Sequence, residues 1–283
     1  MTSKAYWKRR HMFVLLLLGI VLVLASSGRT VYAKKQKAKK RYIVTSNYRY
    51  DNAYNTYGQY TSLKNAKKAV RKQPKYLQGE WFIYDRKERK VVWPDLSTTK
   101  KKIRKAVAWA KAISHDNAHG YTCVGENTKT NLKKRWGRWG RYGDYSCSTI
   151  VTMAYELVGL VNLRDVAKKK NVKMKVLGRT IKPGLNSTSL GKIAKASHHF
   201  KSVSSKMRKK GSKALKPGDI LITYPKEHVA MYIGGGRIVE ARTNERGSDY
   251  APYPYIRPGD QTGREIRVSV YDPREWFYAF RPC

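Results

Sequence analysis

The sequence is poor in acidic residues and in cysteine. It has 19 Asp and Glu residues against 60 Lys and Arg residues in a chain of 283, which gives a formal net charge of +41. Such an excess indicates an anionic partner: nucleic acid, anionic lipid, or a polymer such as a bacterial cell wall. Three cysteines are too few for a disulfide-stapled miniprotein. A wholly disordered polycation is also excluded, because the 41% of hydrophobic residues is enough for one or two cores.

The N-terminus has the three-part layout of a secretory signal peptide. Four basic residues precede an apolar run from Met12 to Ala25, and small or branched residues flank a cut after Ala33. The run of 14 residues is shorter than the roughly 20 that a membrane-spanning helix needs. We therefore expect residues 1–33 to be a signal peptide that meets the membrane only transiently, with an uncleaved anchor as the alternative. Secretion argues against a nucleic-acid partner and favours teichoic acid as the polyanion.

A basic arm and a small α+β module are expected next. Residues 34–41 hold six bases in eight positions and predict a solvated arm. Residues 42–96 begin with the β-rich Tyr42-Ile43-Val44-Thr45, and Ser62 is placed to cap an amphipathic helix. Two further β-rich segments flank Asp85-Arg86-Lys87-Glu88 as a hairpin would. The module has neither His nor Cys, so we interpret it as a wall-binding accessory or as a spacer.

A predicted linker at residues 97–100 separates this module from the second half of the chain, residues 101–283. The second half begins with a helical pattern that has one apolar face. Further along, residues 161–217 carry 17 Lys and Arg against the single Asp165. That stretch is either a solvated face or the lining of an approach for an anionic substrate.

Cys147 is the candidate nucleophile. Apolar residues recur after it at helical spacing, at Ile150, Ala154, Leu157 and Val158, which places Cys147 at or just before a helix N-terminus. Unpaired backbone N–H groups and the helix dipole stabilise a thiolate there, and the same groups can bind an oxyanion. The alternative is a small buried cysteine at the start of a helix.

His228 is the candidate base. It opens the strand pattern His228-Val229-Ala230-Met231-Tyr232-Ile233, which returns after three glycines as Arg237-Ile238-Val239-Glu240-Ala241. If the three glycines form the loop, Glu240 faces Ala230 and is the diagonal neighbour of His228 on one sheet face. A carboxylate there can hold one imidazole nitrogen while the other faces a thiol. A lone histidine on a strand is more often structural, so it is the combination with Cys147 that is specific.

These blocks, taken in order, resemble the NlpC family of papain-like cell-wall cysteine peptidases, and in particular its members in phage endolysins and Gram-positive bacteria. The family pattern of Asp-Cys-Ser before a helix compares with residues 146–148, and His-Val-Gly-Ile-Tyr-Ile-Gly on a strand compares with residues 228–241. The resemblance extends to residues 115–121 and 259–268. It covers roughly residues 101–282.

The resemblance implies an α+β papain-like domain in which the nucleophile helix packs on an antiparallel sheet. It also implies hydrolysis of an amide bond in the stem peptides of peptidoglycan, often beside D-glutamate, without a cofactor. The triad of the family falls here on Cys147, His228 and Glu240. Tyr121, Ser146 and Ser148 fall on substrate-binding positions.

Two departures from the family pattern keep other functions open. Ser146 stands where Asp is usual before the nucleophile, and Glu240 stands where His, Asn or Gln is usual. A non-catalytic wall-binding protein on the same fold is therefore one alternative. An amidase that cuts between muramic acid and the stem peptide is another, because the triad chemistry would be the same.

Two cysteines remain besides Cys147, and the sequence has no common metal-binding motif. Cys123 and Cys283 either form a disulfide, which an oxidising compartment permits, or remain free thiols. The sequence contains no HExxH motif and no cysteine pair at zinc spacing, so it predicts no metal site.

Overall fold

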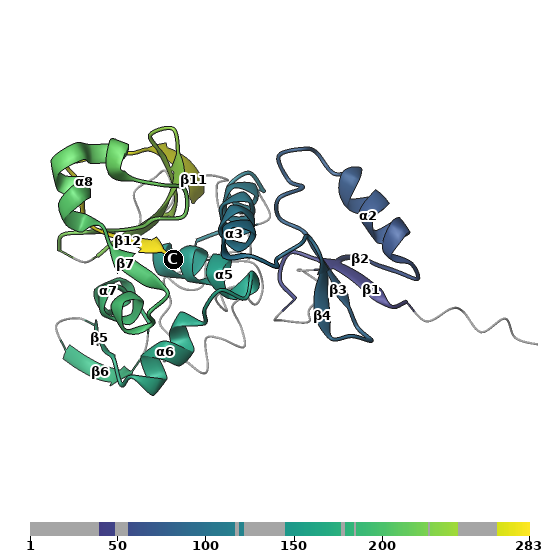
Figure 1. Ribbon diagram of the computed structural model, residues 1–283, viewed down its shortest axis with the longest axis horizontal. Helices are drawn as coiled ribbons and strands as arrows, with labels where there is room; N and C mark the ends of the chain where they lie inside the picture. The colour runs from purple at the N-terminus through teal and green to yellow at the C-terminus, as the bar shows by residue number, and fades with distance from the viewer. Residues whose placement is uncertain are drawn as a thin grey trace, which may run out of the picture. The chain divides into compact units, whose positions relative to one another are not determined.

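The computed structural model describes residues 40–48, 56–116, 119–121, 145–176, 179–183, 185–225, 227–242 and 265–283. They belong to one compact unit, Lys40–Cys283, which holds two main sheets and their helices (Figure 1). The predicted signal peptide and almost all of the basic arm lie outside the described residues. None of the helices in the described ranges is long and apolar enough to cross a membrane.

The first sheet forms the small N-terminal module. Its strands are β1 (Tyr42–Thr45), β2 (Thr56–Tyr60), β3 (Phe82–Asp85) and β4 (Lys90–Trp93), in the antiparallel order β2-β1-β3-β4, and helix α2 (Leu63–Arg71) packs against them. Ser62 caps α2 by accepting a hydrogen bond from the backbone N–H of Asn65 at 3.2 Å. Ala66 and Val70 of this helix are buried with Ile83. The predicted first strand, capped helix and hairpin are confirmed.

The second half is built around a six-stranded antiparallel sheet in the order β11-β10-β9-β8-β12-β7. Its strands are β7 (Phe200–Ser202), β8 (Ile220–Thr223), β9 (Val229–Gly234), β10 (Arg237–Ala241), β11 (Ile266–Val270) and β12 (Trp276–Pro282). The helices are α3 (Thr99–Ile113), α5 (Cys147–Leu157), α6 (Leu163–Lys169), α7 (Ser187–Ala196), α8 (Ser204–Lys210) and the short 3-10 helix η2 (Gly211–Ala214). A two-stranded sheet pairs β5 (Lys173–Val176) with β6 (Arg179–Pro183). This is the α+β class that the sequence predicts.

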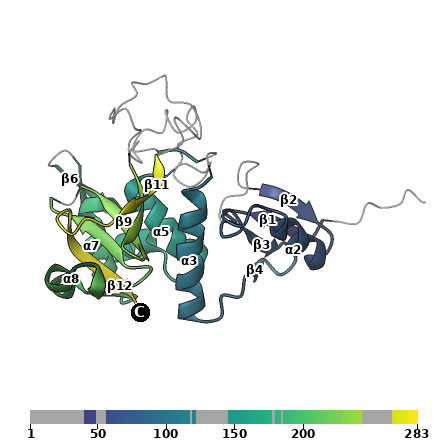
Figure 2. The ribbon, with the colours of Figure 1, turned by 90° about the horizontal axis from the view of Figure 1, so that it is seen from above.

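The two faces of the six-stranded sheet contact different helices. Val229, Met231 and Val239 point into the main core, which α3, α5 and α7 also line, and α3 lies beside α5 (Figure 2) and contacts β9 and β11 as well. The alternate residues, among them Ala230 and Tyr232, point into a second core that contains side chains of α8. Alternation along each strand therefore gives the sheet one face that packs on α3, α5 and α7 and an opposite face that packs on α8.

The hairpin between β9 and β10 has the predicted register and a shorter loop than predicted. Glu240 pairs with Ala230, as expected from the alternation. However, Gly234 is the last residue of β9 and pairs with Arg237, so the loop is only Gly235-Gly236. Both have positive φ, 61° and 66°, which a two-residue type I′ turn requires and glycine permits. A register shift between Arg237 and Ile238 then restores the predicted pairing from Ile238 onward.

Helix α3 begins inside the predicted linker and contacts both sheets. Thr98 caps it by accepting a hydrogen bond from the backbone N–H of Lys101 at 3.2 Å, so residues 98–100 of the predicted linker already belong to its start. Trp109 of α3 donates a hydrogen bond from Nε1 to the carbonyl of Ser46 in the first module, at 3.0 Å. The helix therefore packs on the small module as well as on α5.

Candidate active site

Cys147 is the first residue of α5, and Ser146 is its N-cap. Ser146 Oγ accepts a hydrogen bond from the backbone N–H of Thr149 at 3.3 Å, and Thr149 Oγ1 accepts one from the backbone N–H of Ser146 at 2.7 Å. This reciprocal pair is a capping box, which satisfies two backbone donors at the helix end. Ser146, at the position where the resemblance expects Asp, thus performs a helix-capping role. Cys147 is partly buried at the positive end of the helix.

The segment leading to Cys147 is fixed by backbone and ring contacts. The Tyr145 backbone N–H donates to the carbonyl of Gly120 at 3.0 Å, and Tyr145 forms a parallel bridge with Tyr121. The Tyr145 ring packs edge-on against Trp109, with 5.4 Å between ring centroids. Tyr121, a predicted substrate-binding residue, is therefore held beside the segment that precedes the nucleophile.

Ser146 and Ser148, the other two predicted substrate-binding residues, are buried. Their hydroxyl oxygens lie 3.3 Å apart within the cap. Both side chains consequently serve the start of α5. Their contact with a substrate stays a prediction.

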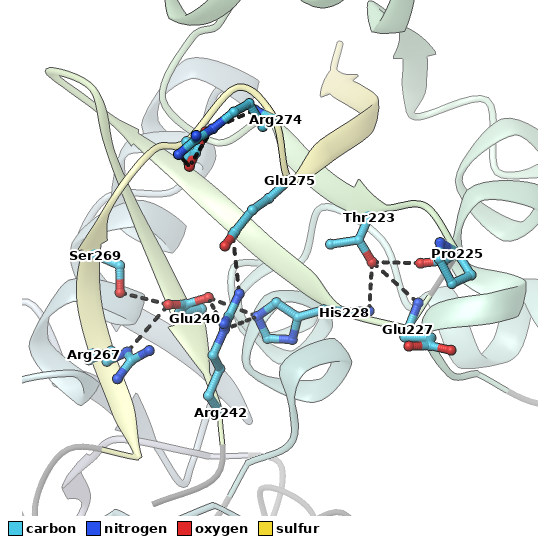
Figure 3. A network of polar contacts seen from close by, with 11 residues as sticks. Thr223, Pro225, Glu227, His228, Glu240, Arg242, Arg267, Ser269, Arg274 and Glu275 are labelled. Carbon is cyan, nitrogen blue, oxygen red and sulfur yellow. Dashed lines mark hydrogen bonds and ion pairs between the residues drawn. The ribbon is translucent and has the colours of Figure 1, made fainter. Parts of the chain in front are cut away.

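His228 and Glu240 are brought together by the hairpin. His228 Nε2 lies 2.8 Å from Glu240 Oε2, and both side chains are partly or fully buried (Figure 3). The His228 backbone N–H donates to Thr223 Oγ1 at 3.1 Å, which ties the start of β9 to the end of β8. The ring of Trp276 lies 5.7 Å from the imidazole, between centroids.

Glu240 is the centre of a larger network. Its Oε2 also accepts a hydrogen bond from Arg242 Nε at 2.8 Å, and its Oε1 accepts one from Ser269 Oγ at 2.6 Å and one from Arg267 Nε at 3.3 Å (Figure 3). Burial alone would raise the pKa of Glu240. Hydrogen bonds from His228 and Ser269 and the charges of His228 and Arg242 outweigh it and hold the pKa at about 2. Glu240 is therefore a carboxylate throughout the physiological pH range.

The tautomer of His228 follows from this network. Nε2 is close both to Glu240 Oε2 and, at 3.2 Å, to Arg242 Nε, and it cannot donate to one and accept from the other. Two N–H groups directed at one carboxylate oxygen satisfy both contacts at 2.8 Å. Nε2 then carries the hydrogen, and in the neutral ring Nδ1 holds the lone pair that a general base needs.

Cys147 and His228 lie on different layers of the fold. Glu240 pairs with Ala230, which points into the core opposite α5, so Glu240 and His228 occupy that same face. Helix α5 packs on the other face, against β9 and β10. A contact between Cys147 and His228 thus requires the N-terminus of α5 to meet the end of β9 where His228 lies.

Sequence reasoning missed Arg242, Arg267 and Ser269. Arg267 and Ser269 come from β11, which pairs with β10 so that Arg267 faces Glu240. The alternation Ile266-Arg267-Val268-Ser269-Val270 gives a strand with one polar face, and that signal could have marked these two residues as site-facing. Cys123, which the sequence leaves either bonded to Cys283 or free, lies outside the described residues. Cys283 is a free, exposed thiol.

Residues 134–257 match the model of the NlpC/P60 family, and this range includes Cys147, His228 and Glu240. Two solved structures, NlpC2 and NlpC1 from Trichomonas vaginalis, are each 14% identical over 71% of this chain, with a TM-score of 0.34. This chain covers 57% and 54% of those two structures, little more than half of their length. A search of curated proteins found no match.

A helix that begins at a cysteine and packs on an antiparallel sheet is the papain-like type of fold, and the second half of the chain has this fold. Within that class, residues 134–257 resemble the NlpC/P60 family. Members of this family are generally cysteine peptidases that act on cell-wall peptidoglycan.

Proposed function

We propose that the protein is a secreted peptidoglycan endopeptidase that hydrolyses an amide bond in wall stem peptides, with Cys147, His228 and Glu240 as its triad. The observation that carries the proposal is the 2.8 Å contact between His228 Nε2 and Glu240 Oε2 inside an NlpC/P60 domain whose Cys147 begins a helix. A histidine held by a carboxylate has its other nitrogen oriented for proton transfer. In the proposal, this second nitrogen, Nδ1 of His228, takes a proton from the thiol of Cys147.

In this mechanism, Nδ1 of His228 takes the thiol proton of Cys147, and the thiolate attacks the carbonyl carbon of the scissile amide. Backbone N–H groups at the start of α5 stabilise the oxyanion that forms. The imidazolium then gives its proton to the leaving amine, which departs as the thioester forms. Water, deprotonated by the same imidazole, hydrolyses the thioester and restores the free thiol.

The bond to be cut is tested by mass spectrometry of purified muropeptides incubated with the protein. Fragments that end within the stem peptide, for example beside D-glutamate, support the endopeptidase. Release of the whole stem from muramic acid identifies an amidase instead. Cys147→Ala is the matched inactive control, and an unchanged muropeptide pattern with the native protein would favour a wall-binding protein.

The basic surface of the second half is proposed to hold an anionic wall polymer such as teichoic acid. Exposed lysines gather on α8, η2 and the turn after it, with no acidic residue between Ser204 and Lys216. We call this the α8 basic surface; it comprises Lys206, Lys209, Lys210, Lys213 and Lys216. Exposed charges act through solvent, so their attraction falls as salt shortens the Debye length from about 10 Å at 0.1 M to about 3 Å at 1 M.

Binding of the Cys147→Ala protein to whole walls, with and without teichoic acid, tests this part of the proposal. Replacing Lys206, Lys209, Lys210 and Lys213 by Gln should weaken binding to intact walls and flatten its salt dependence. The same number of changes on and after α2, at Lys64, Lys68, Lys72 and Lys75, removes equal charge from the small module and shows whether the loss of binding is specific to the α8 basic surface. Equal binding of the native protein to stripped and intact walls would remove the teichoic-acid assignment.

A further inference from the structure

A buried group of three ionisable side chains lies away from the proposed triad. Glu80 precedes β3, and Asp116 and His119 follow α3. Glu80 is 1% exposed and His119 is 6% exposed, while the side chain of Asp116 is 22% exposed. His119 Nε2 lies 3.4 Å from Glu80 Oε1 and 3.6 Å from Asp116 Oδ2, and one donor atom from each residue falls within 4.8 Å of the others.

A hydrogen bond from the imidazole accounts for only one of the two contacts, that of Nε2 with Glu80 Oε1 at 3.4 Å. One N–H at Nε2 cannot point at two carboxylates at once, and both distances exceed the 2.7 to 3.2 Å of ordinary N–H···O bonds. The separations do fit two ligands of one metal ion. Ligands about 2.0 to 2.2 Å from a tetrahedral Zn²⁺ lie roughly 3.4 Å apart.

A second observation concerns the other oxygen of Glu80. Oε2 is buried and has no hydrogen-bond partner among the described residues. A buried acceptor without a partner is costly, and more so when it belongs to a charged group. Burial raises the pKa of Glu80; His119 opposes this shift, whereas the neighbouring carboxyl of Asp116 adds to it. Two adjacent carboxyls in a dry site need either a shared proton or a cation.

Lys105 is the nearby positive charge, and its ammonium is already engaged. Nζ donates to the carbonyls of Gly79 and Trp81, on either side of Glu80, at 2.5 and 2.8 Å. Burial lowers the pKa of Lys105 to about 7, with the charge of Glu80 opposing the shift. Because both of these contacts are to backbone carbonyls, Lys105 leaves Glu80 Oε2 without an ammonium partner.

We propose that Glu80, Asp116 and His119 bind one divalent transition-metal ion of the Zn²⁺ class. One imidazole nitrogen with two carboxylates is a donor set suited to such ions, and the partly exposed side of Asp116 leaves a position for water. The ion would join the small module, through Glu80, to the segment that pairs Gly120 and Tyr121 with Tyr145, two residues before Cys147. The site has a structural role and is separate from the proposed hydrolysis.

Zn²⁺ titration of the full-length, chelator-treated protein tests the proposal, with bound metal measured after dialysis and the melting temperature measured by calorimetry. We expect one equivalent of Zn²⁺ and a rise in melting temperature. Glu80→Gln keeps the shape of the side chain and should weaken binding by at least about 10- to 100-fold, the loss caused by removing even an outer partner of a ligand. Glu88→Gln, an exposed carboxylate of the same module, is the matched control and should bind as the native protein does.

Two further measurements show whether a cysteine binds the metal and whether Asp116 takes part. Co²⁺ bound at this site should lack the intense thiolate absorption that coordination by Cys147 or Cys283 would produce. Asp116→Asn changes the most exposed member of the group and should also weaken Zn²⁺ binding. It takes the place of Glu80→Gln if that variant fails to fold. Absence of stoichiometric Zn²⁺, or binding unchanged by both variants, would overturn the proposal and identify the group as a shared-proton or imidazolium cluster.

Discussion

Nε2 of His228 and Oε2 of Glu240 lie 2.8 Å apart, although the residues are separated by 12 positions in the chain. The tight turn at Gly235-Gly236 folds β10 back on β9 so that both side chains share one face of the sheet. Arg242 and Ser269 then fix the carboxylate from the other directions. The imidazole is thus positioned by a carboxylate that is itself held in place.

Replacing Glu240 separates its orienting role from its charge. Glu240→Gln keeps an acceptor for His228 Nε2 and should remain active. It should also move the acidic limb of the pH–rate profile to lower pH, because the catalytic pair loses its proton more readily once the neighbouring negative charge is gone. Glu240→Ala removes the acceptor and should lower kcat on the order of 10²-fold, with KM little changed.

The matched control is Glu275→Gln, because Glu275 also contacts Arg242, at 3.2 Å, but is not bonded to His228. It should leave the pH–rate profile unchanged. Steady-state kinetics on a defined muropeptide would provide kcat and KM for each variant. If Glu240→Ala were as active as Glu240→Gln, Glu240 would have no orienting role.

Cys147 and Cys283 make an internal comparison of reactivity. Cys283 is exposed, whereas Cys147 is partly buried, so access alone favours labelling of Cys283. A thiol-directed alkylator at neutral pH should nonetheless modify Cys147 faster, since only the thiolate reacts and the helix N-terminus and His228 favour it. Peptide mapping over time measures both rates in one sample. Faster labelling of Cys283 would contradict an activated Cys147.

The parts of the site that depend on local periodicity could be predicted from the sequence. Helical spacing after Cys147 placed it at the start of α5, and the two-residue period of the hairpin placed Glu240 opposite Ala230. The loop was predicted one residue too long because composition alone does not show that Gly234 stays in the strand. Its register shift after Arg237 leaves the rest of the pairing unchanged.

Contacts between distant segments could not be predicted in the same way. Arg267 and Ser269 reach Glu240 only because β11 pairs with β10, and strand pairing depends on the whole sheet. Likewise, Lys105 is one of many lysines in the sequence, and only the packing of α3 on the small module buries it. Pattern reasoning treats such a residue as a solvated charge.

Removing one partner of the ion pair between Arg281 and Asp219 should destabilise the fold strongly. Asp219 is fully buried, and the Arg281 guanidinium donates to its two oxygens at 2.9 and 2.7 Å. Arg281→Met leaves a buried carboxylate with its main partner removed, which typically costs about 3 to 5 kcal/mol of unfolding free energy. Arg274→Met, which breaks an exposed pair with Asp272, should cost less than about 1 kcal/mol.

Urea unfolding of these variants gives the two values directly. Adding Asp219→Asn to Arg281→Met should recover part of the loss, because it removes the uncompensated charge. A loss for Arg281→Met as small as that for Arg274→Met would contradict the role assigned to the buried pair.

Lys105 should make the stability of the fold depend on pH in the alkaline range. Burial lowers its pKa from 10.5 to about 7, opposed by the charge of Glu80, so between these values the unfolded chain binds a proton that the folded chain does not. Folding stability should therefore rise as pH increases from about 7 to about 10.5, by at most on the order of 5 kcal/mol from this residue.

Lys105→Met removes this dependence, so the native protein should gain stability relative to the variant as pH rises. The comparison uses urea unfolding with a chelator present, so that no metal occupies the Glu80 site. Lys102→Met, which removes a solvent-exposed hydrogen bond to the Gly159 carbonyl, is the matched control and should differ from the native protein by a constant amount. A difference for Lys105→Met that is equally constant from pH 7 to pH 10 would show that Lys105 titrates as an exposed lysine does.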